Sequence, residues 1–235
     1  MTVLPADQLK LNLLQYQLDP PPLGCLQSFP GLPGGGAKLI DTSPYGSPGT
    51  LSGPVAWQQL PSGLWVLSFG LEKNYIDCSN PFPVAVKSMS VVCWAYDLQG
   101  KSGVRLFGQY PMFYVLNDSS PRLKSYLSWS DETSSNGEVI AYYSTEKWYH
   151  WAFTLEHTAA GTRFKAYRDG ALVRNSFYAG KTLHDYSYQF CWAFLYNFGS
   201  DCWNGRIGLM KLFNHPLPAF EVSRIYEKEK ELFPL

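Results

Sequence analysis

Aromatic residues in polar, turn-rich stretches are the side chains of this sequence best suited to bind a ligand. The apolar face of a sugar stacks on Trp or Tyr rings, while nearby amides and carboxylates bind its hydroxyls. Trp203 lies in GSDCWNG beside Asn204, so this loop is the leading candidate for a glycan site. The full set of candidate rings in loops or at strand ends is Tyr110, Trp129, Tyr178, Tyr186, Tyr188 and Trp203.

These rings also have a packing interpretation, because Trp and Tyr fill β-sandwich cores through cross-strand contacts. The chain is rich in both residues, with 8 Trp and 16 Tyr. Trp94, Trp151 and Trp192 stand inside strand patterns and are expected in the core. The two interpretations differ in burial, because a ring that binds sugar must be exposed.

The four histidines do not form a catalytic pattern. His150 stands in a strand and is expected to be a hydrogen-bonded structural residue. His184 precedes Asp185, but no G-x-S-x-G sequence and no activated Cys accompanies the pair. A Ser/His/Asp enzyme is therefore not predicted.

The five cysteines have no metal-ligand spacing. Cys93 and Cys191 lie in strand patterns and are expected to be buried thiols. A disulfide between Cys191 and Cys202, or between Cys25 and Cys78, is the alternative, and the sequence leaves both interpretations open.

Composition indicates a folded domain of low charge. Of the 235 residues, 46% are hydrophobic and 16% are charged, with a net charge of +0. Nucleic-acid binding favours clustered Lys and Arg, so no nucleic-acid partner is expected. No stretch reaches about 18 apolar residues, and residues 1–19 do not resemble a secretory signal, so we also expect no membrane span and no export signal.

Short strands separated by Gly, Pro, Asn and Ser dominate the chain and predict an all-β fold. The pattern WYHWAFTLEHTAAGTRFKAYRDGALV, from residue 148 to residue 173, predicts two strands and a hairpin turn at Asp169-Gly170. Val222, Ile225 and Phe233 recur at helical spacing, which predicts a helix over 218–232. Residues 1–37 are rich in Pro and Gly and are expected to form an extended arm, followed by one domain over 38–235.

Several motifs in order resemble the LamG-like branch of the concanavalin A-like lectin/glucanase superfamily. Trp148-x-His150-x-x-x-Thr154 precedes Y-x-D-G, LSFGLEKNYIDC precedes both, and NGRIGLMKLFNHPL resembles the last strand of the family. The resemblance implies a jelly-roll sandwich of two antiparallel sheets. With it we expect an irregular N-terminal arm and one short C-terminal helix.

The resemblance also raises the question of calcium, because many of these sandwiches hold one Ca²⁺ between an early loop and the last strand. Carboxylates and carbonyls are the oxygen ligands that Ca²⁺ prefers. Asp41 in the early loop and Asp201 before the last strand are the candidate ligands. Gly208-Leu209 stands where the family often carries an acidic residue, so the site is expected to be weakened or lost.

The glucanase branch hydrolyses glycans with two carboxylates on one strand, where alternate residues share a face. No Glu of this chain begins an E-x-D-x-E pattern, and Asp131-Glu132 lies in the turn-rich SWSDETSSNG. We therefore expect no enzyme activity.

We expect a non-catalytic structural or adhesion module, a decoration or tail component on the surface of a large assembly such as a bacteriophage virion. Such a protein is made in the cytoplasm and displayed on the particle. Residues 1–37 would contact neighbouring subunits, so an oligomer is expected, and surface glycans are possible ligands. The alternative is a stand-alone glycan-binding, lectin-like domain.

Overall fold

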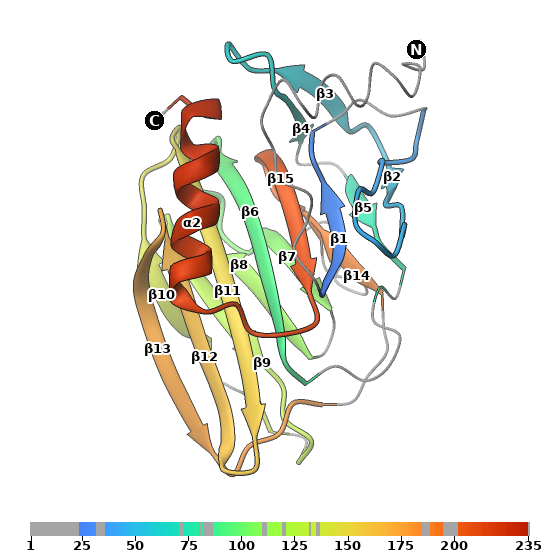
Figure 1. Ribbon diagram of the computed structural model, residues 1–235. Helices are drawn as coiled ribbons and strands as arrows, with labels where there is room; N and C mark the ends of the chain where they lie inside the picture. Colours follow the sequence, from blue (N-terminus) through green and yellow to red (C-terminus); the bar gives the residue numbers. More distant parts are fainter. Residues whose placement is uncertain are drawn as a thin grey trace.

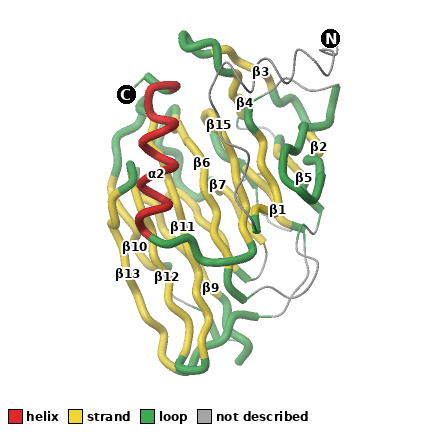
Figure 2. The backbone as a smooth tube through the Cα atoms, viewed as in Figure 1, coloured by secondary structure: helices red, strands yellow, loops and turns green. Residues whose placement is uncertain are grey.

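The computed structural model describes residues 24–31, 36–70, 73–79, 81, 87–109, 112–118, 121–131, 133–134, 137–184, 189–194 and 202–234. Two antiparallel sheets pack face to face and enclose the main core, and one helix lies against the outer face of the larger sheet (Figures 1 and 2). This arrangement confirms the predicted sandwich with one short C-terminal helix.

The larger sheet has eight strands, seven of which form one continuous path. Their spatial order is β13 (Ala171–Ala179), β12 (Gly161–Arg168), β11 (Trp148–Thr158), β6 (Met89–Asp97), β15 (Gly205–Phe213), β4 (Trp65–Phe69) and β3 (Ala56–Gln59). The eighth strand, β1 (Cys25–Phe29), also pairs with β15. One edge of β15 is therefore shared between β4 and β1.

The smaller sheet has seven strands and lies behind the larger one in Figure 1. Their spatial order is β10 (Glu138–Tyr142), β9 (Arg122–Leu127), β8 (Phe113–Asn117), β7 (Arg105–Gln109), β14 (Phe190–Trp192), β5 (Tyr75–Asp77) and β2 (Thr50–Ser52).

Strand β1 corrects the predicted boundary of the N-terminal arm. Its residues pair with β15 in antiparallel register and are buried, so the sandwich includes residues that the prediction gave to the arm over 1–37. Apolar Leu26 and Phe29 fill the core, which outweighs the Pro/Gly-rich composition around them. The remaining prediction for the arm, over residues 1–23, lies outside the described residues.

The hairpin between β12 and β13 forms where the sequence predicts it. Asp169 and Gly170 have φ values of 51° and 75°, and Arg168 pairs with Ala171 across the turn. Positive φ at both central residues defines the two-residue turn that matches strand twist, and glycine adopts it without a steric penalty.

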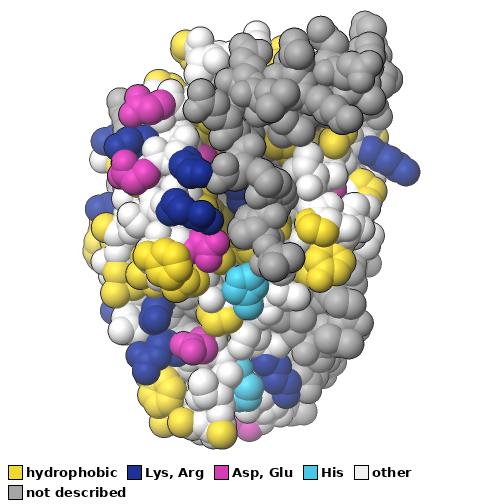
Figure 3. All heavy atoms as spheres, in the orientation of Figure 1, with side chains coloured by type: hydrophobic (Ala, Val, Ile, Leu, Met, Phe, Trp, Pro, Cys, Tyr) yellow, Lys and Arg dark blue, Asp and Glu magenta, His cyan; other side chains and the backbone are white. Residues whose placement is uncertain are grey.

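The helix α2 (Ala219–Glu229) continues into a 3₁₀ turn, η1 (Lys230–Leu232). Val222 and Ile225 pack into an apolar cluster on the outer face of the larger sheet. Positive and negative side chains are interspersed around the helix (Figure 3). Among the described residues, no helix has the length and apolar character that a membrane crossing requires.

All five cysteines are buried and none forms a disulfide, in agreement with the buried-thiol interpretation and not with either disulfide. Burial raises the pKa of Cys25 and of Cys191 to about 12. Because the thiolate is the reactive form, these thiols are unreactive at neutral pH.

His150 is buried beneath α2, where its ring contacts Trp94 at 5.3 Å and Tyr226 at 5.7 Å between centroids. Neither ring nitrogen has a hydrogen-bond partner among the described residues, so the predicted hydrogen-bonded histidine is wrong for the side chain. Burial, assisted by Lys211, lowers the His150 pKa to about 3.

This burial predicts a dependence of stability on pH. The unfolded chain protonates His150 near pH 6.5 and the folded chain only near pH 3, so stability falls as the pH falls through this interval. Between pH 7.5 and pH 5 the contribution of His150 amounts to about 2 kcal/mol. Between these two pH values, urea unfolding of His150→Phe should show a loss of stability that is smaller than the wild-type loss by this amount. Identical pH profiles for His150→Phe and the wild type would contradict it.

Candidate ligand-binding groove

A row of paired residues crosses the outer face of the larger sheet at one end of the molecule. Trp148 of β11 pairs with Tyr96 of β6, Tyr96 with Arg206 of β15, and Arg206 with Ser68 of β4. Paired residues of neighbouring strands point to the same face of a sheet, so these four side chains form one line. Two residues further along these strands on the same face, Trp94 pairs with His150, and both lie under α2.

This row forms the floor of an open groove with a volume of about 610 Å³, which is within the range of small-molecule sites. The β3–β4 hairpin forms one wall, and the turn before β11 and the C-terminal tail form the others. The lining residues are Gln58, Gln59, Leu60, Pro61, Tyr96, Glu146, Lys147, Trp148, Arg206 and Pro234.

Arg206 is the central polar group of the groove. Its guanidinium carbon lies 4.7 Å from the centroid of the Tyr96 ring, and that ring lies 5.5 Å from the Trp148 ring. The Arg206 side chain makes no hydrogen bond or ion pair with any residue that the structure describes, and its Nε is buried without a partner. A stacked guanidinium keeps its N–H edge free for a ligand.

Two buried features hold Tyr96 in position from behind. The Trp203 indole Nε1 donates to the Tyr96 carbonyl oxygen at 3.3 Å. Gly205 lies so close that a Cβ there would be 1.9 Å from the same oxygen, so only glycine fits at this place.

The walls are fixed by contacts between distant segments. The Ser62 hydroxyl donates to the Leu232 carbonyl at 2.6 Å and ties the β3–β4 hairpin to the C-terminal turn. Figure 1 shows both segments at the same end of the sandwich. On the other side, the Glu146 N–H donates to the Asp97 carbonyl at 2.8 Å, which places Glu146 and Lys147 at the rim.

The structure corrects the predicted glycan residues. Trp203, Trp129 and Asn204 are only 1%, 3% and 6% exposed, so none offers a surface for a sugar. Trp129 packs on Tyr178, with 4.8 Å between ring centroids, and the packing interpretation holds for both tryptophans. Turn residues around them suggested exposure, but both side chains face the space between the sheets. Tyr110, Tyr186 and Tyr188 lie outside the described residues.

Asp41 has a structural role in the early loop. Its Oδ1 accepts hydrogen bonds from the N–H groups of Ser28 and Ser43, and its Oδ2 accepts them from the Ser43 hydroxyl and the Ser47 N–H. These four bonds occupy the lone pairs that a calcium ion would need. Within the described part of the chain, no three His, Cys, Asp or Glu residues gather as metal ligands. Asp201 lies outside it.

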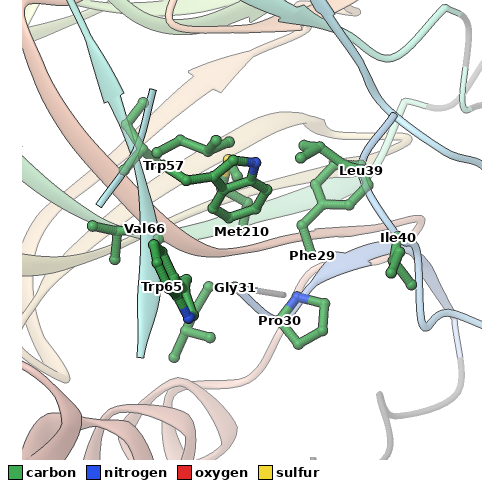
Figure 4. A pocket seen from close by; sticks show the side chains of 13 residues that line it. Phe29, Pro30, Gly31, Leu39, Ile40, Trp57, Trp65, Val66 and Met210 are labelled. Carbon is green, nitrogen blue, oxygen red and sulfur yellow. The ribbon is translucent and has the colours of Figure 1, made fainter. Parts of the chain in front are cut away.

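A second hollow lies where β15 passes from β4 to β1 and is lined by apolar side chains that include Phe29, Trp57, Trp65 and Met210 (Figure 4). Its volume of about 10 Å³ accommodates at most one water molecule. The hollow is therefore too small for a sugar, and the groove at Arg206 is the better candidate site.

Sequence reasoning missed Arg206 and Tyr96 because both stand inside strands and not in loops. A usable signal existed: Tyr96 lies two residues after the strand tryptophan Trp94, hence on the same face. Arg206 is the single charged residue of the otherwise apolar GRIGLM stretch.

The matching family is described as the concanavalin A-like lectin/glucanases superfamily, and its profile matches residues 71–223. The match covers more than half of the chain, which therefore belongs to this superfamily and is a lectin-like jelly-roll module. Comparison with curated protein sequences gave no match.

Solved structures with the same fold include several binding domains. Domain 4 of an extracellular GH43 arabinanase from Geobacillus stearothermophilus, solved with arabinotriose, has a TM-score of 0.63 and 16% identity, covering 86% of this chain and 98% of that one. The binding domain of Paraclostridial Mosquitocidal Protein 1 has a TM-score of 0.67 and 10% identity, covering 86% and 52%. The receptor-binding domain of botulinum neurotoxin D has a TM-score of 0.63 and 14% identity, covering 88% of this chain and 53% of that one. This chain thus spans about half the length of the toxin domains.

A buried ion pair fixes the wall of the groove that the C-terminal tail supplies, and its removal is testable. Glu229 of α2 accepts hydrogen bonds from Lys211 and from the Trp94 indole, and its side chain is only 4% exposed. Lys211→Met leaves this carboxylate without its cation and should cost about 3 kcal/mol in urea unfolding.

The matched control is Lys230→Met, which removes an exposed ion pair with Glu227 and should cost under about 0.5 kcal/mol. The double variant Lys211→Met with Glu229→Leu should regain much of the lost stability. Equal, small losses for Lys211→Met and Lys230→Met would contradict a supporting role for the buried pair.

Proposed function

We propose that the protein is a non-catalytic glycan-binding module and that its ligand binds in the groove at Arg206. One observation carries the proposal: the groove contains polar side chains with no partner in the described structure, namely Gln58, Glu146 and Arg206. Sugars present many hydroxyls that both donate and accept hydrogen bonds, and these side chains offer both kinds of partner. Membership of a lectin-containing superfamily supports the proposal.

Binding is favoured over hydrolysis by the charges of the groove. A glycosidase needs two carboxyl groups about 5–9.5 Å apart across the scissile bond. Of the described residues that line the groove, Glu146 is the single acid, and it stands at the rim. An oligosaccharide incubated with the protein should therefore be recovered intact.

Glycan binding is tested by removing Tyr96, which supports Arg206 and supplies a phenolic hydroxyl. We expect Tyr96→Ala to weaken binding to any sugar found on a glycan array by about tenfold or more, because about 1.4 kcal/mol of hydrogen bonding is lost. Tyr45→Ala is the control, since this ring is exposed but does not line the groove. Calorimetry measures affinity, and circular dichroism verifies folding. A blank array, or equal affinity for both variants, would overturn the assignment.

We further propose that the module is synthesised in the cytoplasm and then displayed on a large assembly such as a virion. This proposal rests on the Pro/Gly-rich composition of the N-terminal residues as a contact for neighbouring subunits. Strand β1 belongs to the sandwich, so a deletion that tests this proposal must leave β1 intact.

The test is therefore a deletion of residues 1–23 and not of residues 1–37. Light scattering should show an oligomer for the full chain and a monomer for the deleted chain, with the same melting temperature for both. A monomer in both cases would remove the assembly role and leave the glycan-binding proposal intact.

A further inference from the structure

We infer that the groove selects sugars that carry a carboxylate, such as uronates or sialates, and that Arg206 binds the carboxylate group. This inference rests on the proposed glycan-binding function and specifies its ligand class. Three observations carry it: the unpaired state of Arg206, the charges of the groove, and the ring beneath the guanidinium.

Arg206 lacks the partner that a half-buried arginine normally has. Its Nε is buried without a hydrogen bond, which costs free energy until an acceptor arrives. The three other described arginines that stack on aromatic rings do have acceptors. Arg122, over Tyr142, donates to Asp118. Arg163, over Phe177, donates to Asn175, and Arg168, over Tyr149, donates to the Tyr142 carbonyl. Arg206 differs from all three, because no described residue accepts a hydrogen bond from its side chain.

The charges of the groove match one carboxylate. Arg206 and Lys147 contribute two positive charges and Glu146 contributes one negative charge, so the lining residues have a net charge of +1. A monoanionic ligand neutralises this charge, whereas a ligand with several sulfates or phosphates would also face Glu146. Because no described acid forms an ion pair with Arg206, the guanidinium does not have to leave an internal partner first.

The geometry favours a planar anion. The guanidinium lies over the Tyr96 ring, with 4.7 Å from its carbon to the ring centroid, and the ring is backed by Trp148. A guanidinium held in this way presents parallel N–H groups, which match the two oxygens of a carboxylate. Because the face of Tyr96 is occupied by Arg206, a neutral sugar cannot gain its usual stacking contact there.

The experiment compares acidic sugars with neutral counterparts by calorimetry on the full chain. The probes are trigalacturonate and its methyl ester, and 3′-sialyllactose and lactose. At least one acidic probe should bind about tenfold more tightly than its neutral counterpart, as expected for hydrogen bonds between charged groups. Preference for one acidic probe distinguishes a uronate from a sialate ligand.

Variants assign the preference to Arg206. Arg206→Gln should abolish it, and Arg206→Lys should retain part of it, because lysine keeps the charge but not the planar fork. Glu146→Gln should strengthen binding of the acidic probe, because it removes the negative charge that faces the carboxylate in the groove. Arg163→Gln is the matched control, since it removes a stacked arginine outside the groove and should leave all affinities unchanged.

The inference is overturned if acidic and neutral probes bind equally, or if the preference survives in Arg206→Gln. In both of these cases sugar binding itself persists, which would leave the proposed function standing. If none of the four sugars binds and a glycan array is blank, the inference and the proposed function fall together.

Discussion

The contacts of Trp94 are the interaction on which the outer half of this structure depends. Its ring stacks on Phe233 with 4.2 Å between centroids, and its indole donates to Glu229 at 2.9 Å. One side chain thereby joins the larger sheet to both the last turn of α2 and the C-terminal tail. The contact needs Gly208 beside it, because a Cβ there would lie 2.8 Å from Val66 and 3.4 Å from Phe233.

The groove depends on this contact through a chain of rings. Phe233 contacts Trp148 at 4.9 Å, Trp148 contacts Tyr96 at 5.5 Å, and Tyr96 supports the Arg206 guanidinium. Close-packed aromatic side chains have few alternative rotamers, so the position of Arg206 is set by packing that begins under the helix. The cation is thus held in place by packing, which would reduce the entropy lost on binding the proposed ligand.

The sequence was informative where the backbone pattern is local and uninformative where the site is assembled across the sheet. Alternating burial, as along β9, and the Asp169-Gly170 turn are properties of neighbouring residues, which a local sequence pattern can reveal. The burial of Trp203 depends on the packing of a turn between two sheets. The groove draws on segments from Gln58 to Pro234, and no local pattern reveals that they meet.

The predicted ligand-binding tryptophans are buried, and an arginine lines the groove instead. This difference has a physical reason. A tryptophan has a large apolar surface, so in this sandwich the rings of Trp203 and Trp129 contribute more by filling the core than they could at the surface. Burying the whole guanidinium of Arg206 without a partner would cost free energy, and although its Nε is buried, its terminal nitrogens remain where water or a ligand can reach them. In the proposed site, recognition would therefore rest on hydrogen bonds from a fixed cation and not on stacking. Such sites discriminate strongly, because a ligand that lacks the matching acceptor leaves a partly desolvated donor unsatisfied.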